Sequence, residues 1–194
     1  MPGSVKTKAT HRLEGVATIF TLAATTASLA AAVGPFAWLV PSTVPQSWKP
    51  LALPTGAAVL WVPPSLRQVK SDAASVSAAD VVNGQYLAYL NSTPRQGGET
   101  LADWPRFRVA HLLAESAASV HTIASSTNLS FPGARGSCLI DIYVTKVKQH
   151  RFREIACFVK GATTASVIIA AAPASHWARA ATLLERAVAA YEVH

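Results

Sequence analysis

The sequence predicts an α+β fold in which helices pack on an antiparallel β-sheet, preceded by one N-terminal hydrophobic segment. Two observations lead to this prediction. Residues 137–145 and 151–160 are rich in β-branched and aromatic side chains, and residues 165–171 form a third such run before a helical pattern closes the chain. Residues 15–40 contain no charged residue and follow a basic terminus.

Residues 137–145 and 151–160 are expected to pair as a hairpin. Side chains alternate across a strand, so Cys138 and Cys157 share one apolar face in this pairing. The other face is also largely apolar, although Asp141 and Glu154 interrupt it. Two apolar faces indicate a sheet that is at least partly covered on both sides.

The register of this hairpin decides whether the two cysteines pair. A turn centred on 147–148 places Cys138 opposite Cys157, where a cross-strand disulfide forms, but it also places Asp141 opposite the like-charged Glu154. Moving the turn by one residue separates the carboxylates and makes the cysteines diagonal. We favour the disulfide, and two buried free thiols are the alternative.

The N-terminus predicts export. Residues 1–14 are basic, and 15–40 are apolar and long enough to span a bilayer, which requires ~20 residues. Small residues at 30–32 offer a signal-peptidase site, although cleavage there leaves the apolar segment 33–40 as the new terminus. We favour an uncleaved single-pass anchor in the cell membrane. The alternative is a signal peptide and a secreted protein.

The remaining chain divides into a proline-rich linker, 41–54, and an extracytoplasmic α+β domain, 55–194. An exported domain lies in a compartment that permits disulfides. The net charge of +7 is spread along the chain without aromatic residues interleaved on one face, so we expect no nucleic-acid partner.

Between linker and hairpin, residues 85–91 predict a strand and 120–125 a further short one. We expect loops at 66–80 and at 128–136. A helix is expected from Leu101 or Trp104 to about Ala117, with this apolar stripe: Phe107, Ala110, Leu113, Ala114 and Ala117. That stripe places the polar residues on the opposite face: Arg108, His111 and Glu115. The closing helix should dock through Trp177, Ala181, Leu184, Val188 and Tyr191.

Three segments carry a resemblance: Ala-Tyr-Leu-Asn-Ser-Thr-Pro (88–94), Gly-Glu-Thr-Leu-x-x-Trp (98–104) and Val-Ile-Ile-Ala-Ala-Ala-Pro (167–173). With the order of elements they resemble the PsbP-like fold, in particular LpqN-type exported bacterial proteins, over roughly residues 50–191. The resemblance implies an extracytoplasmic interaction or small-ligand module rather than an enzyme. The lipid-anchoring cysteine common in LpqN-type proteins is absent here.

The candidate binding site is the basic tip of the hairpin, which we call the tip cluster: Lys146, Lys148, His150, Arg151 and Arg153. It suits anionic polymers, phospholipid headgroups or an acidic patch on an envelope protein. Basic residues also keep an exposed hairpin end soluble, which is the alternative interpretation.

The sequence offers no catalytic or metal-ligating motif. None of the six histidines stands in a zinc-site or metalloprotease spacing, and we expect no cofactor. We therefore expect a binding domain without catalytic activity. One alternative is a carrier of small hydrophobic ligands, with a cleft lined by Trp104, Phe107, Tyr143 or Phe158. The other is a hydrolase that uses His111, His150 or His176.

Overall fold

The computed structural model describes residues 34–194. Within this range the chain forms a seven-stranded sheet, a three-stranded sheet and two helices, and every strand pairing is antiparallel. The predicted α+β class is thereby confirmed. In chain order the elements are β1 (Lys49–Ala52), β2 (Ala58–Val62), β3 (Arg67–Val69), β4 (Val76–Val82), β5 (Gln85–Pro94), α1 (Trp104–Glu115), β6 (Ala117–Phe131), β7 (Ala134–Thr145), β8 (Arg151–Lys160), β9 (Ala165–Pro173), α2 (Trp177–Ala189) and β10 (Glu192–Val193).

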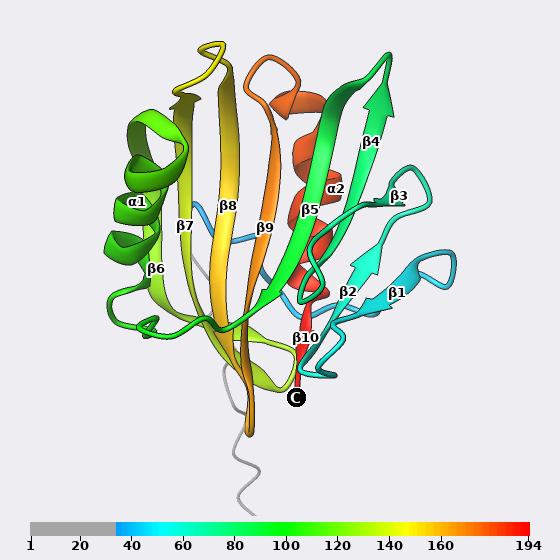
Figure 1. Ribbon diagram of the computed structural model, residues 1–194. Coiled ribbons are helices and arrows are strands. Elements are labelled where there is room, and N and C mark those ends of the chain that lie inside the picture. The colour runs from blue at the N-terminus through cyan, green and yellow to red at the C-terminus, as the bar shows by residue number, and fades with distance from the viewer. Residues whose placement is uncertain (1–33) are drawn as a thin grey trace, which may run out of the picture. The chain divides into compact units, whose positions relative to one another are not determined.

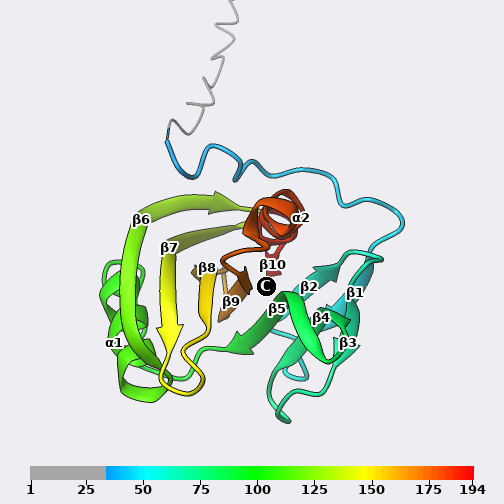
Figure 2. The same ribbon diagram turned by 90° about the horizontal axis from the view of Figure 1, so that it is seen from above.

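The larger sheet has the order β3-β4-β5-β9-β8-β7-β6 and is covered unequally on its two faces. Figure 1 shows α2 behind the sheet and α1 in front of β6 and β7, while the front of β9 and β5 carries no helix. Figure 2 shows the same arrangement from above, with α1 and α2 on opposite sides of the sheet. The two apolar faces predicted for the hairpin follow from this layering.

The main core lies between α2 and the back of the sheet. Leu184 and Val188 of α2 are buried there with Ile155 and Ile168 of the central strands. The apolar stripe predicted for this helix is confirmed, although Ala181 is only half-buried. Tyr191, just past the helix, donates its hydroxyl proton to Ser166 Oγ at 2.8 Å, so its buried polar end is satisfied.

The hairpin of β7 and β8 has the register that the disulfide requires. Cys138 lies opposite Cys157 and is bonded to it, and Asp141 lies opposite Glu154. The expected two-residue turn is instead a four-residue loop, 146–149, in which Lys148 and Gln149 adopt positive φ. Because this loop is centred on the same residue pair, 147–148, the register is unchanged.

Two segments expected to be loops contain strands. Residues 66–80 include β3 and most of β4, and 128–136 is the junction of β6 and β7 around a tight turn at Gly133, whose φ is +65°. The strand expected at 120–125 is part of the much longer β6. β6 is an edge strand with mostly polar, exposed side chains and three register shifts, so its alternation is obscured in the sequence.

Residues expected in the anchor and linker pack in the domain. Phe36 and Leu39 fall in the predicted segment 15–40, and both are buried in the main core. The predicted spacer 41–54 contains β1 and buried Trp48. The folded unit therefore includes 34–54, because these apolar side chains have a core to enter. Most of the predicted anchor lies outside the described residues, and no helix within 34–194 is long and apolar enough to cross a membrane.

Candidate functional site

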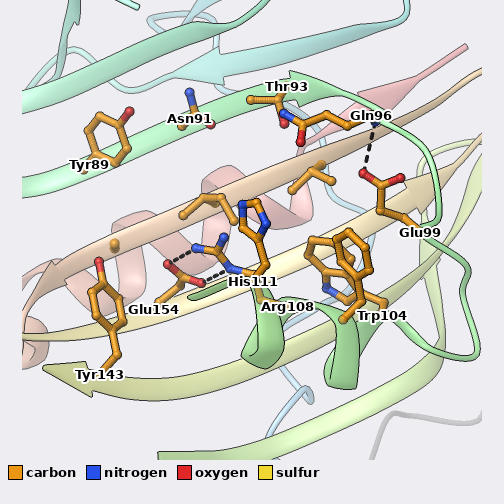
Figure 3. Close-up of a pocket in the computed structure, with 14 residues that line it drawn as sticks. Tyr89, Asn91, Thr93, Gln96, Glu99, Trp104, Arg108, His111, Tyr143 and Glu154 are labelled. Carbon is orange, nitrogen blue, oxygen red and sulfur yellow. Dashed lines mark hydrogen bonds and ion pairs between the residues drawn. The ribbon is translucent and has the colours of Figure 1, made fainter. Parts of the chain in front are cut away.

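The best-formed site is a cavity of about 280 Å³ between α1 and the front of the sheet. Its lining residues come from α1, from strands β5, β7, β8 and β9, and from the loop before α1. In Figure 1 the front of β9 and β5 carries no helix. The aromatic side chains of Trp104 and Phe107 form one wall of the cavity. Polar side chains from β5, β7, β8, α1 and the loop before α1 line the other walls. Figure 3 shows these polar residues: Tyr89, Asn91, Gln96, Arg108, Tyr143 and Glu154.

The floor of the cavity follows from the register of four strands. Asp141 of β7, Glu154 of β8, Ala171 of β9 and Tyr89 of β5 lie in one row across the sheet. Paired residues in neighbouring strands point to the same face, so all four face α1. Ala171 is the smallest of the row, and its short side chain leaves the space between Glu154 and Tyr89.

Trp104 fixes the helix over the sheet. Its indole Nε1 donates a hydrogen bond of 2.9 Å to the carbonyl oxygen of Ala156 in β8, and its ring stacks on Phe107 with centroids 6.0 Å apart. The residues at four-residue intervals from Trp104 are Arg108 and Leu112, and these point inward. The prediction that Arg108 faces away from the docked side is therefore wrong, and Leu113 of the predicted stripe is exposed.

Arg108 turns inward because the sheet presents a buried carboxylate to it. Its Nε and one terminal amino group donate to the two carboxylate oxygens of Glu154 at 2.7 and 2.8 Å. The side chains are 15% and 1% exposed, so this is a buried bidentate ion pair. The pair supplies the counterion that Glu154 needs on an otherwise apolar strand face.

Asp141 has no such partner. It is 0% exposed, and within the described residues neither of its carboxylate oxygens accepts a hydrogen bond. Burial and then the charge of Glu154 raise the pKa of Asp141 to about 8, against the opposing effect of Arg108. Asp141 therefore holds a proton at neutral pH. Burial likewise raises the pKa of the neighbouring Tyr143 hydroxyl above its ordinary value.

The tip cluster is divided by the structure. Lys146, Lys148, His150 and Arg151 are exposed at the end of the β7–β8 hairpin. Lys146 donates from Nζ to the carbonyl oxygen of Ala114 at 2.9 Å, near the C-terminus of α1, where a cation is favourable. Arg153 lies further along β8 on the side of α2, with its guanidinium 4.9 Å from the ring centroid of Trp177. Four of the five predicted residues are thus gathered, and Arg153 is not among them.

Sequence reasoning missed the cavity's polar groups. A cleft is present at the position proposed for a hydrophobic ligand, and Trp104, Phe107 and Tyr143 line it. The fourth residue named, Phe158, is buried and does not line the cavity. The missed lining residues are Tyr89, Asn91, Arg108 and Glu154, and Asp141, buried opposite Glu154, was missed as well. One signal was present: two carboxylates on an inward strand face require a buried counterion, and the helix offered two candidates, Arg106 and Arg108.

Of the three histidines named for a hydrolase, only His111 lines the cavity, and its Nε2 lies 3.1 Å from Glu115. Both cysteines are in the disulfide, so neither offers a thiolate. Within residues 34–194 no group of three His, Cys, Asp or Glu side chains is placed to hold a metal ion.

Comparison with known proteins gives a fold. No family model matches the sequence, and no curated protein matches it. The solution structure of PsbP (CyanoP) from the cyanobacterium Synechocystis matches at 12% identity over 79% of this chain and 95% of that one, with a TM-score of 0.54. LpqN of Mycobacterium tuberculosis, described as involved in cell envelope biogenesis, matches at 14% identity over 75% of each chain, with a TM-score of 0.36. The described domain has the PsbP-like fold that the sequence segments indicated.

Proposed function

We propose that this protein is an extracytoplasmic binding domain without catalytic activity, and that the cavity beside α1 binds a small polar ligand. The observation that carries the proposal is the buried Arg108–Glu154 pair at the wall of a cavity that also presents Asn91 and two tyrosines. Binding sites combine apolar walls with a few oriented polar groups, and this cavity has both.

The polar lining favours this ligand class over the hydrophobic carrier. An apolar ligand would strip water from Asn91, Gln96 and the outer face of Arg108 without replacing its hydrogen bonds, which costs free energy. A ligand with hydroxyl, amide or charged groups replaces those bonds. Trp104 and Phe107 then contact its apolar part.

The absence of catalysis in this proposal rests on how the titratable groups are engaged. Glu154 already accepts both hydrogen bonds of the Arg108 fork, which disfavours a role as a general base. Asp141 is enclosed and cannot reach a reacting atom. A carboxylate already held by an arginine and a second one enclosed in the sheet suit recognition better than proton transfer.

The compartment in this proposal follows from two features. The disulfide fits an oxidising environment, and the basic terminus followed by an uncharged apolar run is typical of an exported or membrane-tethered protein. In the tethered form, the N-terminal run is the membrane partner. The exposed residues of the tip cluster would then contact an anionic polymer or envelope protein.

The cavity can be blocked with one substitution. Ala171→Leu adds bulk between Glu154 and Tyr89, and Ala178→Leu makes the same change on the exposed side of α2. The full chain, purified in neutral detergent after incubation with a cell envelope extract, is analysed by native mass spectrometry. We expect a small molecule to be retained by the wild type and by Ala178→Leu, and lost from Ala171→Leu. Equal retention by all three, or none by the wild type, would contradict the proposal.

A further inference from the structure

The folded domain begins inside the apolar run. Phe36 and Leu39 are both 5% exposed in the main core, so the chain is fixed to the domain from residue 36 onward. The uncharged stretch before it, residues 15–33, is about as long as a bilayer span, which requires ~20 residues. In the tethered form no residues remain for a spacer, and the part of the domain around residue 36 lies at the bilayer surface.

That part of the domain lies on the outer side of α2. Figure 2 shows residues 34–48 passing α2 on the side away from the sheet, and Figure 1 shows the same segment behind the sheet. The guanidinium of Arg186 in α2 lies 5.6 Å from the ring centroid of Trp48, which holds the segment against the helix. The surface nearest the bilayer therefore combines this segment with the exposed side of α2.

The segment presents apolar and aromatic side chains. Val40 is 56% exposed, and Trp38 is half-buried. The indole N–H of Trp38 donates a hydrogen bond of 2.8 Å to the carbonyl oxygen of Pro35. Aromatic side chains that are apolar at one end and polar at the other are enriched where a membrane meets water, so Trp38 suits such a position.

The adjoining surface carries cations without acidic partners. Arg179 and Arg186 lie two turns apart and both point away from the core side of α2, and Lys49 follows Trp48. All three cations are exposed, and none forms an ion pair within residues 34–194. Glu185 is the one acidic residue of α2, and the cation that acts on it is Arg153 of β8.

We propose that residues 34–40 and the outer side of α2 rest on an anionic lipid bilayer, with Trp38 and Val40 at the interface and Arg179 and Arg186 against the headgroups. This rests on the tethered form of the proposed function. A bilayer is the occupant because the tether keeps this surface beside the membrane, and its charge is complementary to anionic headgroups. The cavity lies on the face of the sheet opposite α2, so it is turned away from the bilayer and toward its ligand.

Labelling can locate the surface, because Cys138 and Cys157 are both in the disulfide and an introduced cysteine reacts alone. The full chain with a fluorophore on Val40→Cys or Thr182→Cys is reconstituted into vesicles of phosphatidylcholine and phosphatidylglycerol that contain a lipid with a nitroxide on its headgroup. Leu113→Cys, 43% exposed on α1, is the matched control on the other face of the sheet. We expect the nitroxide to quench the labels at 40 and 182 about threefold more than the label at 113.

The contribution of charge is measured with double variants. Arg179→Gln with Arg186→Gln should reduce quenching at residue 182 about twofold or more, because two cations near the headgroups are lost. The control, Lys148→Gln with Arg151→Gln, removes two cations from the hairpin tip and should leave quenching unchanged. Urea unfolding of both double variants in detergent verifies that the domain is folded.

Equal quenching at 40, 182 and 113, or quenching that falls in the tip variant and not in the α2 variant, would overturn this membrane-facing surface. The tether and the cavity ligand stand after either result. A full chain that does not float with the vesicles would remove the tethered form and this inference with it. The molecule retained by the wild type and lost from Ala171→Leu then still decides the cavity proposal separately.

Discussion

Two adjacent carboxylates with one guanidinium define the chemistry at the scale of single residues. Arg108 pairs with Glu154 in bidentate geometry, which leaves Asp141 buried without a donor among residues 34–194. Asp141 lies opposite the like-charged Glu154, the contact that in the sequence argued against this register. It is tolerated because the arginine neutralises one carboxylate and a proton neutralises the other at neutral pH.

The stability of the protein should therefore fall as pH rises. The pKa of Asp141 is raised from 3.8 to about 8 in the folded chain, so between these values the folded state binds more protons than the unfolded state. Stability is lost across this window and is level above it. Asp141→Asn should remove this decline and raise the free energy of unfolding at about pH 8 by ~1–3 kcal/mol. Urea unfolding at several pH values measures this, and an unchanged slope would contradict the assignment.

The β7–β8 hairpin is the central structural unit at the scale of elements. Its disulfide joins directly opposed residues, and its two faces contact α2 on one side and α1 on the other. It thereby sets the position of Glu154 relative to Arg108. The same hairpin carries the exposed basic residues at its tip.

Loss of the disulfide should destabilise the domain. Cys138 and Cys157 are 19 residues apart, and a cross-link over a loop of this length contributes ~3 kcal/mol by limiting the unfolded chain. The double variant Cys138→Ala with Cys157→Ala should lose about this amount in urea unfolding. Wild type unfolded in reductant is the control and should behave similarly. Two titratable thiols in freshly isolated, denatured protein would show that the bridge is absent in the cell.

Elements with strong local signals were predictable, and those that depend on tertiary partners were not. β7, β8, β9 and α2 alternate or repeat clearly because each has a buried apolar face. The middle of β4, residues 77–80, consists of small and polar residues, and Ser77 is satisfied by Tyr89 Oη at 3.0 Å. For α1, periodicity identified the helix, but the docked face is set by Trp104 and Arg108 meeting acceptors on β8.

The candidate site was only partly predictable for the same reason. Aromatic residues near a helix indicated a cleft, and three of the four named side chains line it. Its polar character depends on the cross-sheet row of Glu154, Ala171 and Tyr89, which combines strands far apart in the sequence. Sequence spacing carries no information on that row until the strand order is known.

At the scale of the whole molecule, the folded unit extends further toward the N-terminus than composition suggested. Phe36 and Leu39 enter the core between the sheet and α2 although they belong to the apolar run. One end of an apolar run can belong to the core of the following domain. Hydropathy alone does not show at which residue that domain begins.

Phe36→Ala should destabilise the domain by ~3 kcal/mol, because Phe36 is 5% exposed and its removal leaves a cavity in the core. Val40→Ala, four residues on and 56% exposed, is the matched control and should change stability by less than ~0.5 kcal/mol. Thermal and urea unfolding of both variants measure this. Equal, small effects would show that residues 34–40 contribute nothing to the domain.

The central claim is that the cavity beside α1, and not the hairpin tip, is the small-molecule site. Two-dimensional ¹H–¹⁵N NMR tests it directly during titration with the low-molecular-weight fraction of an envelope extract. The indole N–H of Trp104 and the Nε–H of Arg108 report on the cavity, and the backbone amides of 146–151 report on the tip. We predict shifts of the first two signals, absent in Ala171→Leu, with the tip unchanged. Shifts confined to the tip would contradict the account.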